Sequence, residues 1–197
     1  MNSQQFTPAY IAQYSDMLFR TGLKGKDDDE IETKLDALIR LFCCLHGRDV
    51  FLKQYEKELS GRLLNKTSID WSIEEKMIQK LKVECGANQV QKMTQMFKDM
   101  TLSKEVQQEF NTHLSSTDSK VNGVEFVPEV LTNGTWPPMD KKECKLPPEL
   151  SACCTRFETF FKNKNQNRTL SWMYNFGSVE IVMTKAKKRY QLIVNVF

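Results

Sequence analysis

Apolar side chains recur at helical spacing through the first part of the chain. In residues 49–64 an apolar residue returns at every fourth position and marks one face of a helix: Phe51, Tyr55, Leu59 and Leu63. Charged residues fill the opposite face, which we expect to lie in water: Lys53, Glu56, Lys57 and Arg62. The pattern predicts an amphipathic helix whose apolar stripe must be covered by neighbouring helices.

A second helix is predicted after the polar break at residues 65–70. Ser72 is a candidate N-cap, and Glu75 stands three residues later, where a capping box requires it. The apolar stripe of this helix consists of Met77, Ile78, Leu81 and Cys85. Gly86 suits the left-handed conformation that commonly ends a helix.

The rest of the first 115 residues has the same periodicity. A helix over residues 7–22 has an apolar face formed by Tyr10, Ile11, Tyr14, Met17 and Leu18. A second helix runs to about His46, and two more are expected beyond Gly86: one to Met100, and another that is capped within residues 101–103 and continues to Leu114. The sequence therefore predicts an antiparallel helical bundle over residues 1–115.

The pattern changes after a polar linker at residues 115–123. Alternating or β-branched residues predict strands over residues 124–131, 169–174, 179–184 and 190–196. Pro128 would place the first of these strands at a sheet edge or a bulge. A helix is predicted over residues 147–162. The predicted fold class is thus α+β: a helical bundle, then one helix on a three- to four-stranded, mainly antiparallel sheet over residues 116–197.

The composition is that of an ordinary soluble globular protein, with 40% apolar and 27% charged residues. No apolar run approaches the ~20 residues that a transmembrane helix needs. The N-terminus has neither the basic start nor the apolar core of a signal peptide. We therefore expect a protein of the cytoplasm, the nucleus or both, without a membrane partner.

Candidate catalytic and metal-binding chemistry is sparse. The six cysteines and two histidines lack the short, fixed spacings of a zinc site, so we expect no metal or other cofactor. No nucleotide-binding, hydrolase or metalloprotease motif is present. Glu74 and Glu75 are adjacent in a helix and point to different faces, so they cannot flank one bond. The sequence therefore indicates a protein that is not an enzyme.

The predicted sheet is the candidate functional element. A small sheet on one helix has an open edge with unpaired backbone groups, which either is protected or accepts a strand from a partner. Protection by the basic residues 185–189 and recruitment of a partner are equally compatible with the sequence. Apolar and aromatic residues give this sheet two faces that both need to be covered: Leu170, Trp172, Tyr174, Val179, Ile181, Met183, Tyr190, Leu192, Val194 and Val196.

Seven short motifs resemble the cullin family, the scaffold subunits of RING-type ubiquitin ligases. In chain order they are DVF at residues 49–51, YEKELSGRLL at 55–64, MIQKLKVECG at 77–86, MFKDM at 96–100, VLTNGTWP at 130–137, LPPEL at 146–150 and NRTLSW at 167–172. The resemblance covers roughly residues 7–197. It departs from the family at Asn167, where cullins usually have Gly, and at Gly61, which weakens a helix by about 1 kcal/mol.

The resemblance implies a function. In cullins the corresponding sheet accepts a β-strand from the RING-box subunit, so it implies that residues 169–196 form a RING-docking sheet and that the ten residues above bind this partner. Catalysis then belongs to partners: the RING-box protein carries zinc, and a ubiquitin-conjugating enzyme carries the ubiquitin thioester. The scaffold supports protein degradation by raising the effective concentration of substrate near the ubiquitin donor.

Two alternatives stay open at this point. The cullin arm of N-terminal repeats, the winged-helix segments and the lysine that receives a ubiquitin-like modifier have no counterpart in residues 1–197, so we consider a fragment or a small regulator that sequesters RING subunits. A less favoured hypothesis is a nucleic-acid-binding module, because residues 141–197 hold 11 Lys and Arg against 4 Asp and Glu. Its candidate patch would combine Arg168 and Trp172 with Lys185, Lys187, Lys188 and Arg189.

Overall fold

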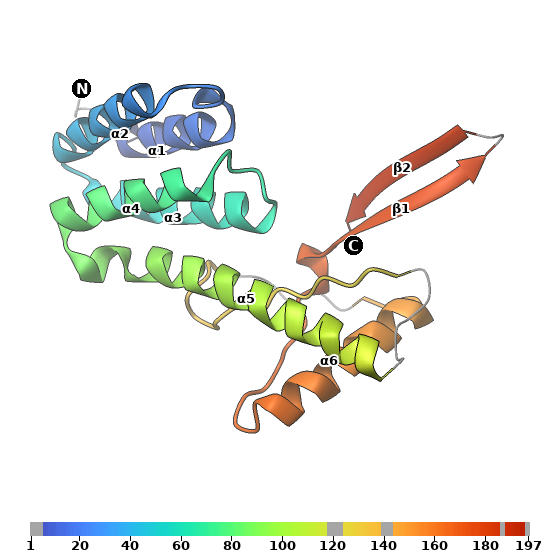
Figure 1. The fold of residues 1–197 in the computed structure, drawn as a ribbon. Helices are drawn as coiled ribbons and strands as arrows, with labels where there is room; N and C mark the ends of the chain where they lie inside the picture. The colour runs from blue at the N-terminus through green and yellow to red at the C-terminus, as the bar shows by residue number, and fades with distance from the viewer. Residues whose placement is uncertain (1–5, 118–123, 139–143, 186–187, 196–197) are drawn as a thin grey trace. The chain divides into compact units, whose positions relative to one another are not determined.

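The computed structural model describes residues 6–117, 124–138, 144–185 and 188–195, which form two compact units (Figure 1). The first unit contains residues 1–103 and 130–137, and the second contains residues 104–129 and 138–197. The predicted class, a helical bundle and then a small mixed domain, is confirmed. The predicted division after residue 115 stays a prediction.

Four helices lie side by side in the first unit: α1 (Thr7–Met17), α2 (Asp28–Cys43), α3 (Arg48–Leu64) and α4 (Trp71–Cys85). A π-helical turn, Leu18–Gly22, continues α1, so this helical segment ends at Gly22 as predicted. A short 3₁₀ turn, Ala87–Val90, leads into α5 (Gln91–Ser116), whose residues up to Ser103 belong to this unit.

The apolar stripes of α3 and α4 form the core of this unit. The side chains of Phe51, Tyr55, Leu59 and Leu63 are completely buried, as are those of Met77 and Leu81. The rings of Phe51 and Tyr55 stack with centroids 5.7 Å apart, and Phe19 meets the Tyr55 ring edge-on at 6.3 Å. Burial of each such side chain contributes about 1.5–3 kcal/mol, so these stripes hold the bundle together.

Of three helix boundaries predicted in this part of the chain, two are wrong, and one, the end of α4 at Gly86, is correct. The N-cap of α4 is Asp70, whose side chain accepts a hydrogen bond from the backbone N–H of Ser72 at 2.8 Å; the predicted capping box does not form. Gly86 has the positive φ expected of it, 86°, but its ψ of 159° is not left-handed helical. The predicted break near residues 101–103 is absent: α5 runs continuously from Gln91 to Ser116, and the Thr101 hydroxyl donates to the Phe97 carbonyl instead of capping a new helix.

The second unit is built on α6 (Pro148–Lys164), the end of α5 and the hairpin of β1 (Ser178–Lys185) and β2 (Lys188–Asn195). A 3₁₀ turn, Tyr174–Phe176, precedes the hairpin. Phe110 and Phe157 pack edge to face with ring centroids 5.1 Å apart, and Phe126 contacts both rings. These aromatic contacts form the core of the unit.

The sheet has two strands among the described residues, where three or four were predicted. Residues 124–131 are not a strand, since Pro128 has no N–H to donate and the backbone N–H and C=O of Val130 both bond to the Ser103 hydroxyl, at 2.8 and 3.0 Å. Residues 169–173 are also irregular. Among the described residues, no helix is both long and apolar enough to cross a bilayer.

Candidate functional site: the C-terminal hairpin

The two hairpin strands place six predicted site residues on a single face. β1 and β2 are antiparallel, and Val179 faces Val194, Ile181 faces Leu192, and Met183 faces Tyr190. Directly opposed residues lie on the same side of an antiparallel pair. We call this surface the apolar hairpin face; its members are Val179, Ile181, Met183, Tyr190, Leu192 and Val194.

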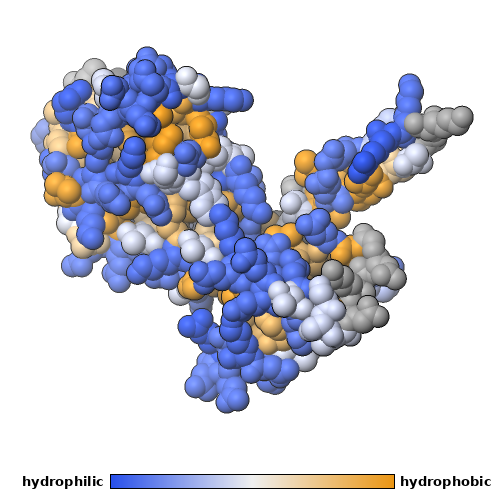
Figure 2. Space-filling model, viewed as in Figure 1, coloured by the Kyte–Doolittle hydropathy of each residue, from blue (hydrophilic) through white to orange (hydrophobic). Residues whose placement is uncertain are grey.

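The apolar hairpin face is largely open to solvent. Val179 is half-buried, and the other five side chains have exposed fractions between 43% (Val194) and 47% (Leu192). Apolar colour therefore runs along the hairpin in the space-filling view (Figure 2). Contiguous apolar patches on a soluble protein commonly mark interaction sites, whereas scattered single residues do not.

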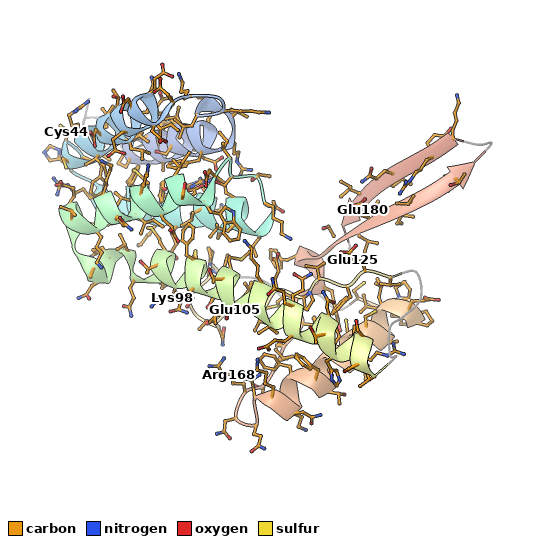
Figure 3. All side chains as sticks on the ribbon, in the orientation of Figure 1. Cys44, Lys98, Glu105, Glu125, Arg168 and Glu180 are labelled. Carbon is orange, nitrogen blue, oxygen red and sulfur yellow. The ribbon has the colours of Figure 1, made fainter. Side chains whose placement is uncertain are left out.

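The opposite hairpin face is mostly polar. Glu180, labelled in Figure 3, accepts a hydrogen bond from the side-chain amide of Gln191. Thr184 and Arg189 face each other near the end of the ribbon. Ile193 is the most exposed apolar residue of the hairpin, at 73%, and it is paired with Glu180. The two faces therefore differ enough to serve as a matched pair in mutagenesis.

Both outer edges of the hairpin lack a neighbouring strand within the described part of the chain. A two-stranded ribbon is at best marginally stable in water and gains stability from further strands or a covering layer. An open edge offers alternating backbone N–H and C=O groups that pair with an incoming strand. The geometry thus suits recognition of an extended peptide segment.

Three predicted site residues do not lie on the hairpin. Leu170, Trp172 and Tyr174 precede it in irregular or 3₁₀ structure, and all three are half-buried, so their prediction as sheet residues is wrong. Val196 lies outside the described residues. The six hairpin residues are brought together, and the role of the whole set in partner binding stays a prediction.

Trp172 is held in the aromatic core of the second unit. Its indole N–H donates to Glu158 of α6, and its ring lies 6.0 Å from the rings of Phe126 and Phe157. Tyr174 stacks on it with centroids 6.2 Å apart, and burial raises the pKa of the Tyr174 hydroxyl. These contacts anchor the segment that leads into β1. These contacts also occupy the Trp172 ring, which the candidate nucleic-acid-binding patch would have included.

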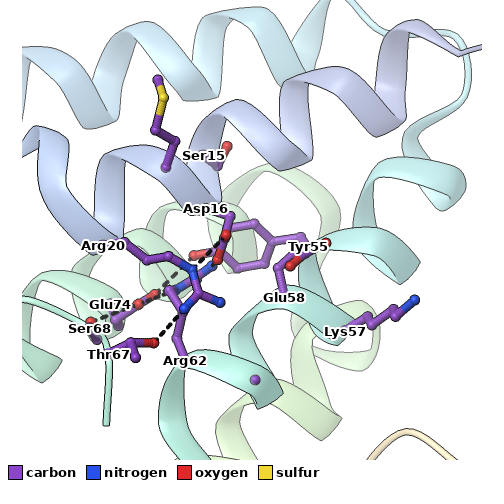
Figure 4. A network of polar contacts seen from close by, with 12 residues as sticks. Ser15, Asp16, Arg20, Tyr55, Lys57, Glu58, Arg62, Thr67, Ser68 and Glu74 are labelled. Atoms are coloured by element: carbon purple, nitrogen blue, oxygen red, sulfur yellow. Dashed lines mark hydrogen bonds and ion pairs between the residues drawn. The ribbon is translucent and has the colours of Figure 1, made fainter. Parts of the chain in front are cut away.

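A buried polar network in the first unit was not predicted (Figure 4). Arg62 was expected in water, but its side chain is completely buried. Its guanidinium donates twice to the Glu74 carboxylate, at 2.6 and 2.9 Å, and once to Asp16, at 2.8 Å. It also lies over the rings of Phe19 and Tyr55, at 5.0 and 5.4 Å from their centroids. A bidentate Arg–carboxylate pair satisfies both charges without water.

The sequence contained a signal for this burial. Tyr55, Leu59 and Arg62 follow the i, i+4, i+7 spacing of one helix stripe, so Arg62 shares the face of two core residues. Glu74 and Glu75 do point to different faces, as expected, since Glu74 is buried and Glu75 is exposed. Ser68 adds a hydrogen bond to Glu74 at 2.9 Å. The network joins α1, α3 and α4 and therefore fixes their packing.

A second buried carboxylate explains two of the sequence motifs. Asp99, in MFKDM, accepts hydrogen bonds at 2.8 Å from the backbone and hydroxyl of Thr132 and from the indole of Trp136, both in VLTNGTWP. Gln95 adds a fourth bond, at 3.0 Å. The two motifs thus meet at one fully satisfied acidic side chain and have a structural role.

Two buried cysteine side chains, Cys153 and Cys154, offer little reactivity. Burial raises the pKa of Cys154 to about 11, and it also raises the pKa of Cys153. Such thiols are almost entirely protonated at neutral pH and are poor nucleophiles. Within the described residues, no group of three or more His, Cys, Asp and Glu side chains has the arrangement of a metal site.

Comparison with known proteins assigns both parts of the chain. Residues 1–107 match the cullin alpha solenoid domain, and residues 130–197 match the cullin alpha+beta domain. Over 195 residues the chain is 34% identical to Cullin-3 of Dictyostelium discoideum and 36% identical to Cullin-4A of Mus musculus. These matches include 99% and 98% of the chain but 25% and 26% of the relatives, so it spans about a quarter of their length. The chain belongs to the cullin family.

Proposed function

We propose that this chain is a scaffold segment of a cullin-RING ubiquitin ligase and binds the RING-box subunit by strand addition to its hairpin. The observation that carries this proposal is the apolar hairpin face, whose side chains are mostly exposed beside strand edges that have no neighbouring strand among the described residues. Family membership supports the same function. The proposal places the chain in the cytoplasm or nucleus, in ubiquitin-dependent protein degradation.

Strand addition accounts for both unusual properties of the hairpin. An added strand pairs with backbone groups on one edge, and each such hydrogen bond contributes about 0.5–1.5 kcal/mol. Its alternate side chains extend the apolar hairpin face, so that an apolar layer of the partner can cover a wider surface. Burial of a Leu or Ile side chain from solvent contributes about 1.5–3 kcal/mol, less for side chains that are already half covered.

In this proposal the chain performs no chemistry itself. The RING-box protein holds zinc and recruits the ubiquitin-conjugating enzyme, which carries ubiquitin as a thioester. The first and second units contribute by holding partners in position. A tethered ubiquitin donor and its acceptor meet at a far higher effective concentration than free ones. The buried networks around Arg62 and Asp99 favour this role, since they rigidify the first unit.

Co-expression with a RING-box protein tests the proposal. We expect the full chain to co-purify with it, and we expect a variant lacking residues 169–197 to lose the partner. Two substitutions on the apolar hairpin face, Ile181→Ser with Leu192→Ser, should weaken binding at least ten-fold.

The matched control is Ile193→Ser, which removes a more exposed apolar side chain from the opposite face. It should leave the affinity within about three-fold. Equal losses for both variants, or retention of the partner by the truncated chain, would show that the apolar hairpin face is not the binding site.

A further inference from the structure

We draw no further inference here: the strongest candidate, the line of apolar side chains on α1 in which Phe6 is joined by Tyr10, Tyr14 and Met17, three residues expected to face the core that are exposed instead, carries nothing, because nothing among the described residues shows what covers it.

Discussion

Single residues show most clearly where a pattern of apolar and polar positions is insufficient. The amphipathic pattern assigned Arg62 to water, whereas the folded chain buries it between Glu74, Asp16 and two aromatic rings. Periodicity alone does not identify the partner of a buried charge, because Glu74 lies on another helix. Only the packing of α3 against α4 brings the two side chains together.

Removing the charge of Glu74 tests the importance of this pair. Glu74→Gln leaves the Arg62 guanidinium buried without its bidentate partner, which should reduce the free energy of unfolding by about 3 kcal/mol. Glu75→Gln, at the exposed neighbouring position, should change it by less than about 0.5 kcal/mol. Urea denaturation followed by circular dichroism measures both. Similar small losses for the two variants would mean that the network is not stabilising.

Tyr55 gives the same network a dependence on pH. Burial, assisted by the nearby Glu74 carboxylate, raises the pKa of Tyr55 well above its ordinary value of about 10. The unfolded chain loses this proton first as pH rises, so the folded state is destabilised progressively above about pH 10. Below that pH, Tyr55 is protonated in both the folded and the unfolded chain, so its contribution to the free energy of unfolding is fully present.

The variant Tyr55→Phe has no proton to lose at this position. Its free energy of unfolding should therefore fall less steeply than that of the unmodified chain between about pH 9.5 and 11. Parallel pH profiles for the two proteins would show that Tyr55 ionises equally easily in the folded and unfolded states.

At the scale of elements, the sequence predicted helices more reliably than their ends. The stripes of α3 and α4 lie in the core as expected, because their spacing is long and regular. The start of α4 was predicted at the wrong residue, because two nearby side chains, Asp70 and Ser72, can both cap a helix. Which of them does so depends on where the backbone turns.

The two candidate caps can be separated by mutation. Asp70→Ala removes the side chain that accepts from the Ser72 N–H and should cost about 1 kcal/mol of stability. Ser72→Ala removes a hydroxyl that does not cap and should change stability by less than about 0.5 kcal/mol. Thermal unfolding of both variants measures the difference, and the reverse ranking would favour the capping box at Ser72.

The strand predictions, like those of the helix ends, were only partly correct. Alternation correctly predicted the strands β1 and β2, since a hairpin is a local structure with a period of two. It did not predict that six of the apolar residues share one face, which the register of the two strands shows. The same reasoning failed for residues 169–174. The Trp172 and Tyr174 side chains there pack into an aromatic core contributed by distant segments, and no adjacent strand pairs with this backbone in the described structure.

At the scale of the whole molecule, family membership and the structure explain different features of the chain. The family models cover both the helical part and the mixed part, so membership of the cullin family explains why a helical unit and a hairpin unit occur in one chain. The structure shows in addition which hairpin residues are exposed on the same face. A pattern along the chain could not supply this exposure, because it depends on what α6 and the aromatic core leave uncovered.

Backbone amide hydrogen exchange of the hairpin, with and without a bound RING-box subunit, tests the central claim most directly. Strand addition predicts that alternate amides along the outer edge of β1 or β2 become protected at least ten-fold when the partner binds, while amides exposed on α3 and α4 do not change. A complex that forms without new protection on either outer edge of the hairpin would contradict the account.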